Sequence, residues 1–205
     1  MAVVDAGVAS GAGWTAADLA SAFLAGGATL LQVRAKAASG RWLFDTASAV
    51  VALAHEASAR VIINDRADIA RLSGADGVHV GQDDLAPALV RIVVGERMMV
   101  GVSTHTQEQV DAAAGQPISY VAIGPVFDTR TKPSHHRAVG LDGVREAARV
   151  TRAAGLPLVA IGGIALESAA DVIGAGADSV AVISDLLVAG QPEARVRAYL
   201  ERLAV

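Results

Sequence analysis

Residues 61–65 read Val-Ile-Ile-Asn-Asp, a short β-branched run that ends in two polar residues. The same pattern recurs where Gln32 follows Leu30-Leu31 and where Ser103 follows a valine-rich run. A strand of a parallel sheet with helices on its outer face is buried along its body and meets solvent at its carboxyl end. We therefore expect the polar residues that follow such runs to converge on one rim of the fold.

Eight apolar runs of this kind are spaced along the chain, at residues 2–4, 30–33, 61–63, 78–80, 99–102, 120–123, 158–161 and 179–183. Helical periodicity occupies most of the intervals, at residues 16–25, 43–59, 87–94, 107–114, 141–154 and 166–173. Alternating strands and helices predict a parallel sheet, and eight such units favour a closed (β/α)8 TIM barrel, an α/β fold, over an open sheet. A length of 205 residues is short for that barrel, so we expect residues 1–205 to form one domain with short loops.

The composition narrows the class of protein further. A hydrophobic fraction of 53% with 3% aromatic residues implies a core of Ala, Val, Ile and Leu, which fill small barrels. The absence of cysteine excludes disulfides, a thiol nucleophile and a cysteine metal site. A net charge of −4 argues against general nucleic-acid binding, so a polyanionic ligand needs a local cluster of cations. No leader and no membrane-length apolar run are found, which predicts a cytoplasmic protein without a membrane partner.

One cluster of candidate ligand-binding residues follows the second, third and fourth predicted strands. Gln32, Arg34 and Lys36 alternate along an extended segment, so their side chains point to the same side. If that side is the barrel interior, two cations enter the mouth; otherwise they extend along the helix layer into water. Asp65 follows the third strand, and Asp83 and Asp84 follow the fourth. Two carboxylates from adjacent strand ends, completed by water and phosphate oxygens, suit Mg²⁺. Helix capping is the structural alternative for such aspartates.

A second anion site is expected after the seventh and eighth strands, at residues 160–164 and 182–185. In these barrels the loops after those two strands commonly bind phosphate through backbone N–H groups, and glycine lets the anion approach. The loop after the sixth strand, residues 125–139, is the longest and carries Thr129, Thr131 and Lys132. A long loop in a barrel with short connections indicates a functional segment.

Six segments follow one another along nearly the whole chain, at residues 32–36, 63–68, 77–85, 101–105, 124–132 and 160–164. They include Gln-Val-Arg-Ala-Lys, Ile-Asn-Asp-Arg-Ala-Asp and Ala-Ile-Gly-Gly-Ile. In this order and at this spacing they resemble the thiamine phosphate synthase family. Each motif alone is weak, but six in register make the resemblance specific.

The resemblance implies a transferase that acts on small molecules. It would join 4-amino-2-methyl-5-pyrimidinylmethyl diphosphate to a thiazole phosphate through a pyrimidine carbocation, with Mg²⁺ as cofactor, and release pyrophosphate. The pyrimidine diphosphate would be held by Gln32, Arg34, Lys36 and Asn64, and Mg²⁺ by Asp65 and Asp84. The departing pyrophosphate would be held by Ser103 and Lys132, and the thiazole phosphate by Thr129, Thr131, Gly163, Ile183 and Ser184. Catalysis would be electrostatic, by Arg34, Lys36, Ser103 and Lys132.

Two other functions stay open at this point. A related thiazole tautomerase, an isomerase, binds a similar thiazole phosphate but uses a histidine after the glycine of the sixth strand, where this chain has Pro125. A non-catalytic protein that binds phosphorylated heterocycles would share every proposed residue. Whether the chain forms a homo-oligomer is also open.

Overall fold

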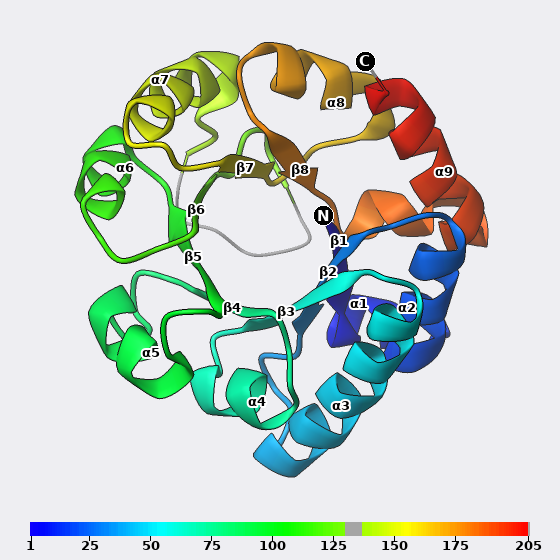
Figure 1. The fold of residues 1–205 in the computed structure, drawn as a ribbon. Helices are drawn as coiled ribbons and strands as arrows, with labels where there is room; N and C mark the ends of the chain where they lie inside the picture. The colour runs from blue at the N-terminus through cyan, green and yellow to red at the C-terminus, as the bar shows by residue number, and fades with distance from the viewer. Residues whose placement is uncertain (130–136, 205) are drawn as a thin grey trace.

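The computed structural model describes residues 1–129 and 137–204, which form a ring of parallel strands surrounded by helices (Figure 1). Each strand pairs with its neighbours in chain order, and the ring closes where Ala2 bridges to Val182. The strands are β1 (Ala2–Asp5), β2 (Leu30–Arg34), β3 (Arg60–Asn64), β4 (Gly77–Val80), β5 (Met99–Thr104), β6 (Tyr120–Ile123), β7 (Leu158–Ile161) and β8 (Ser179–Ala181). The predicted TIM barrel is confirmed, with every strand boundary within two residues of its predicted position.

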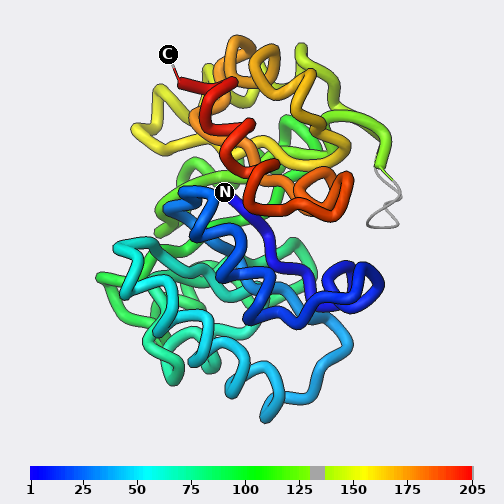
Figure 2. Tube along the Cα trace, turned by 90° about the vertical axis from the view of Figure 1, so that its right-hand side faces the viewer, coloured from blue at the N-terminus to red at the C-terminus, as the bar shows by residue number. Residues whose placement is uncertain are grey.

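The helices form the outer layer, and α9 packs beside α2 to complete it (Figures 1 and 2). They are α1 (Ala6–Gly11), α2 (Ala16–Ala25), α3 (Gly40–Glu56), α4 (Ala67–Leu72), α5 (Pro87–Val94), α6 (Gln107–Ala114), α7 (Gly140–Ala153), α8 (Leu166–Gly174), the 3₁₀ segment η1 (Ser184–Gly190) and α9 (Pro192–Leu203). The six predicted helices are present, whereas α1, α4, η1 and α9 were not predicted. No helix among the described residues is both long enough and apolar enough to span a bilayer.

Two separate apolar cores fix the direction in which each strand residue points. The larger core lies between strands and helices, and includes Leu31 and Val33 from β2 packed with Phe23 from α2. The smaller core lies inside the barrel and includes Val3, Tyr120, Ala122, Val159 and Ala181. Alternate strand residues therefore face the interior, and the last of them on each strand lies at the carboxyl-end rim.

Candidate active site

A pocket opens at the carboxyl-end rim and extends into the barrel. Its empty volume is about 820 Å³, which includes open solvent at the mouth. Six predicted substrate-binding residues line it: Gln32 and Arg34 from β2, Asn64 from β3, Ser103 from β5, and Thr129 and Ile183, which follow β6 and β8. Gln32 and Arg34 therefore point into the barrel and not along the helix layer into water. Gln32 is buried, and the side chain of Arg34 is 18% exposed.

Arg34 is held in this first pocket by an ion pair with Asp5, at the end of β1. The other carboxylate oxygen of Asp5 accepts hydrogen bonds from the backbone N–H groups of Gly7 (3.0 Å) and Val8 (3.1 Å), which begin α1. These contacts fix the carboxylate, and the carboxylate then orients the guanidinium. Asp5 was not predicted as a site residue, although an aspartate after the apolar run of β1 follows the pattern seen at the end of β3.

Lys36 does not line the first pocket; it belongs to a charged group on the adjoining rim, together with Asp65 and Asp84. The Lys36 Nζ atom lies 2.7 Å from Asp65 Oδ2, and the carboxyl groups of Asp65 and Asp84 share a hydrogen bond. Asp84 Oδ2 also accepts a hydrogen bond of 2.7 Å from the Gly81 N–H. The structure thus brings together the three residues predicted at the ends of β2, β3 and β4. The capping alternative is wrong for both aspartates, because α4 and α5 begin without a side-chain cap hydrogen bond.

The carboxyl pair fits a divalent cation. Burial and then the hydrogen bond with Asp84 raise the pKa of Asp65 above its usual value, although Lys36 acts in the opposite direction. Burial alone would raise the pKa of Asp84. The hydrogen bond from the Gly81 N–H, the contact with Asp65 and nearby positive charge outweigh burial, so the pKa of Asp84 lies below its usual value. Two carboxyl groups in contact need a shared proton or a cation between them. In the described part of the chain no cluster of three metal-ligating side chains exists, so water and substrate oxygens would complete the ligand set.

Asp65 adopts a left-handed backbone conformation, with φ of 65°. Few non-glycine residues adopt this conformation, and those that do are concentrated at functional sites. Its N–H donates a hydrogen bond of 2.7 Å to the His79 carbonyl on β4. This bend turns the Asp65 side chain from the direction of β3 toward Lys36 and Asp84.

A second pocket adjoins the first, at the ends of β7 and β8. Four residues predicted to hold the thiazole phosphate line it: Thr129, Gly163, Ile183 and Ser184. Thr129 and Ile183 line both pockets, so the two spaces share a wall. The predicted division into a charged site and a glycine-rich site therefore corresponds to two neighbouring regions of the rim.

Gly163 is required by close packing between two loops. Its φ is +67°, and a Cβ atom there would lie 2.6 Å from the Asp128 carbonyl oxygen and 2.7 Å from that of Phe127. The preceding residue, Gly162, accepts a hydrogen bond of 3.0 Å from the Phe127 N–H. The loop after β7 is thus fitted directly against the loop after β6, which sets the wall of the second pocket.

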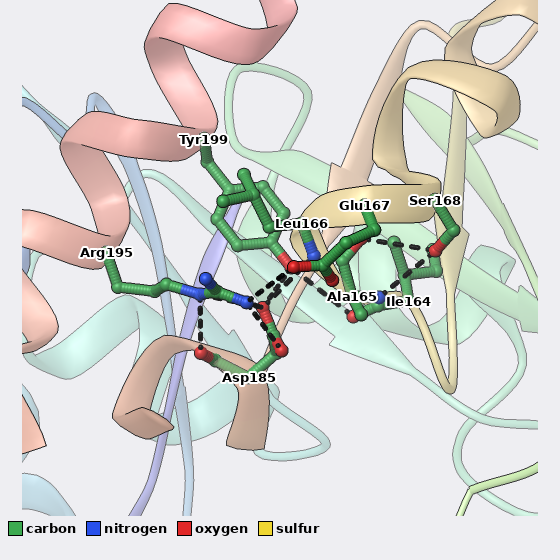
Figure 3. Close-up of polar contacts among 8 residues, drawn as sticks. All are labelled: Ile164, Ala165, Leu166, Glu167, Ser168, Asp185, Arg195 and Tyr199. Carbon is green, nitrogen blue, oxygen red and sulfur yellow. Dashed lines mark hydrogen bonds and ion pairs between the residues drawn. The ribbon is translucent and has the colours of Figure 1, made fainter. Parts of the chain in front are cut away.

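A partly buried carboxylate, Asp185, lines the second pocket and links the elements around it (Figure 3). Asp185, in the first turn of η1, accepts hydrogen bonds from Tyr199 Oη (2.6 Å), Arg195 Nη2 (2.8 Å) and the Leu166 N–H (3.2 Å). Burial and then the Asp185 carboxylate raise the pKa of Tyr199, so its hydroxyl remains a donor. Asp185 therefore joins α8, α9 and η1 at the base of the glycine-rich loop. The sequence analysis missed this support because its members are distributed over three elements.

Some residues of the first pocket were not predicted from the sequence. Some predicted residues are not among those that the structure describes. His79, Tyr120 and His105 line the first pocket but were not predicted as site residues, although His79 and His105 belong to the motifs at residues 77–85 and 101–105. Thr131 and Lys132 lie outside the described residues, so their predicted roles stay predictions.

Fold and site together define a (β/α)8 barrel with two neighbouring pockets at its mouth, where enzymes of this fold carry their active sites. Comparison with known families is more specific. The model described as thiamine monophosphate synthase (TMP-TENI) matches residues 1–186, and the chain belongs to this family.

Individual relatives agree with the family match. The chain is 47% identical over 190 residues to a thiamine-phosphate synthase of Koribacter versatilis, covering 92% of this chain and 87% of the relative. It is 40% identical over 195 residues to a thiamine-phosphate synthase of Chloroflexus aurantiacus, covering 95% and 88%. A solved structure, thiamine phosphate pyrophosphorylase from Pyrococcus furiosus, superposes with a TM-score of 0.88 at 27% identity, covering 99% and 94%. The predicted family is confirmed.

Proposed function

We propose that this protein is a transferase of thiamine biosynthesis that condenses 4-amino-2-methyl-5-pyrimidinylmethyl diphosphate with a thiazole phosphate. The products are thiamine phosphate and pyrophosphate. Family membership supports this reaction. The observation that carries it is the shared wall of the two pockets, because a condensation needs both phosphorylated substrates bound side by side.

The first pocket and its charged rim take the diphosphate substrate. Gln32 and Asn64 provide amide groups suited to the polar edge of a pyrimidine, while Arg34 and Lys36 bind the diphosphate oxygens. Ser103 donates to the same group. Lys132, from the loop after β6, is proposed to add a further positive charge there.

The second pocket takes the thiazole phosphate. Backbone N–H groups around Gly163 and Ser184, with the hydroxyl groups of Thr129 and Thr131, are proposed to hold its phosphate. Ile183 provides an apolar surface for the ring at the wall between the pockets. This placement directs the thiazole nitrogen toward the pyrimidine methylene carbon.

The chemistry requires no nucleophilic side chain. The bond between the methylene carbon and the diphosphate oxygen breaks, and its electron pair leaves with the oxygen. The 4-amino group releases electrons into the ring and stabilises the resulting carbocation. The lone pair of the thiazole nitrogen then forms the new carbon–nitrogen bond. The protein contributes positive charge at the leaving group and alignment of the two reactants.

Asp65 and Asp84 would hold Mg²⁺ at the rim. A bound Mg²⁺ supplies charge neutralisation for the leaving diphosphate. Lys36 contacts Asp65 directly, so it is placed to bind the same diphosphate while it limits repulsion between the two carboxyl groups. We further propose that residues 1–205 act as one domain in the cytoplasm on these small-molecule substrates, without nucleic-acid or membrane partners.

One assay tests the proposed function against its alternatives. Purified protein is incubated with both phosphorylated substrates and Mg²⁺, and thiamine phosphate and pyrophosphate are measured. The proposal expects both products in equal amounts. Isomerised thiazole phosphate without condensation would support a tautomerase instead, and saturable binding of both substrates without any product would support a binding protein.

A further inference from the structure

Behind Ser103, two buried side chains form a hydrogen-bonded chain inside the barrel. His79 Nε2 lies 2.8 Å from Ser103 Oγ, and His79 Nδ1 lies 2.9 Å from Tyr120 Oη. His79 and Tyr120 are each 6% exposed, and their rings stack with centroids 5.5 Å apart. In so enclosed a place an unpaired polar group would be costly, so these hydrogen bonds order both side chains.

The strand register builds this chain across three neighbouring strands. His79 on β4 is paired with Gly101 on β5, and Gly101 is paired with Tyr120 on β6. A Cβ atom on Gly101 would lie 2.0 Å from the Tyr120 ring, so only glycine leaves room for the ring to cross β5. Because Gly101 has no side chain, the tyrosine hydroxyl can reach the histidine.

The hydrogen bonds in this chain run in one direction, from Tyr120 to His79 and from His79 to Ser103. Burial raises the pKa of the Tyr120 hydroxyl, so the hydroxyl keeps its hydrogen and needs an acceptor. Within residues 1–129 and 137–204, the acceptor in contact with it is His79 Nδ1. A neutral imidazole that accepts at Nδ1 carries its hydrogen on Nε2. His79 therefore donates to Ser103 Oγ, and the Ser103 hydroxyl hydrogen is left to point into the pocket.

We propose that Tyr120 and His79 are positioning residues that fix the Ser103 hydroxyl as a hydrogen-bond donor to the departing diphosphate. This inference rests on the proposed function, because it assigns the receiving group as the diphosphate. In the opposite direction of the chain, Ser103 would donate to His79 and present only lone pairs to an anionic leaving group. The tyrosine selects against that direction by holding the tautomer.

The first test reads the tautomer directly. Wild-type protein with ¹⁵N-labelled histidine is examined by NMR at neutral pH, and the His79 signals are assigned by their loss in His79→Gln. The expected result is a neutral ring with hydrogen on Nε2, and a gain of the Nδ1–H form in Tyr120→Phe. A neutral ring with its hydrogen on Nδ1 in the wild type would overturn the proposal, because Nε2 would then accept a hydrogen bond from Ser103.

The second test is a double-mutant cycle in the synthase assay. Ser103→Ala should lower kcat about a hundredfold, the typical loss of one donor to a developing negative charge. Tyr120→Phe should lower kcat about tenfold, with an unchanged KM for the thiazole phosphate. The double variant should match Ser103→Ala alone, because the tyrosine acts only through the serine.

The cycle separates this inference from the proposed function. If Tyr120→Phe lowers kcat by the same factor in the Ser103→Ala background, the tyrosine has a general structural role and the inference is wrong while the synthase function stands. If the wild type makes no thiamine phosphate, both the proposed function and this inference fail.

Discussion

The rim of the barrel presents two different kinds of candidate anion site on its two sides. At the ends of β2, β3 and β4 it presents charged side chains, among them Arg34, Lys36 and Asp65. At the ends of β7 and β8 it presents a glycine-rich backbone around Gly163 and Ser184. The charged side suits a diphosphate that develops further charge as it leaves, whereas the backbone side suits a phosphate that is only held in place.

The two sides also differ in how they are supported. On the charged side Arg34 and Lys36 each contact a partner of opposite charge, Asp5 and Asp65 respectively. On the backbone side the support comes from Asp185, which joins three helical elements (Figure 3). Substitutions on the charged side should therefore affect chemistry directly, and substitutions on the backbone side should act through the position of a loop.

The sharpest test of the charged side is removal of its metal and metal ligands. A chelator should abolish turnover of the wild type, and added Mg²⁺ should restore it. Asp84→Asn should lower kcat about a hundredfold and raise the Mg²⁺ concentration needed for half-maximal activity, because an amide keeps one oxygen but loses the charge. The matched control is Asp83→Asn, an exposed neighbour outside the carboxyl pair, which should behave as wild type. Full activity in the presence of chelator would contradict a role for Mg²⁺ on the charged side.

Arg34→Ala tests whether the two sides act on different substrates. It should raise the KM for the pyrimidine diphosphate about thirtyfold, equivalent to about 2 kcal/mol for a hydrogen bond between charged groups. The KM for the thiazole phosphate should not change. Arg41→Ala is the control, since it removes the same charge from an exposed ion pair with Asp45 on α3. An equal loss for both substrates would show general damage to the barrel mouth and contradict the division into two sides.

The sequence predicted the parts of this molecule that follow from local pattern. All eight strands were predicted because a strand buried on both faces reads as a continuous apolar run, as at residues 120–123. The short helix α4, with six residues, has too few turns to show periodicity. The contact between Lys36, Asp65 and Asp84 could be anticipated, because residues at the ends of adjacent parallel strands lie on one rim.

Contacts that depend on packing in three dimensions could not be predicted in this way. Tyr120 reads as an ordinary strand residue, and its link to His79 depends on the register of β4, β5 and β6 and on the space above Gly101. Asp185 and Tyr199 are 14 residues apart and meet only once α9 has packed against η1. Spacing along the chain carries no signal for either contact.

Gly163→Ala tests the backbone side. The new Cβ atom would lie 2.6 Å from the Asp128 carbonyl oxygen, so the loop after β7 must move away from the loop after β6. We expect the KM for the thiazole phosphate to rise about tenfold, or about 1.4 kcal/mol, with little change for the pyrimidine diphosphate. Gly155→Ala is a matched control, because Gly155 has a similar φ of +69° but nothing within 4 Å of its Cβ position. It should lose stability without loss of affinity, and an equal effect on affinity would show that the clash is irrelevant.

The smallest expected effect comes from Tyr199→Phe, which weakens the support of the backbone side. The variant loses one hydrogen bond to Asp185 but keeps the ring, whose centroid lies 5.8 Å from Arg195 Cζ. Asp185 retains its bonds from Arg195 and from the Leu166 N–H, so the carboxylate is not left without a partner. The free energy of unfolding should fall by about 1.5 kcal/mol, measured by urea denaturation. Affinity for the thiazole phosphate should fall about threefold, since η1 and α8 shift only slightly when one of three contacts is lost, and affinity for the pyrimidine diphosphate should stay unchanged. A loss of stability with no change in thiazole phosphate affinity would mean that the Asp185 contacts hold the helices together without setting the second pocket.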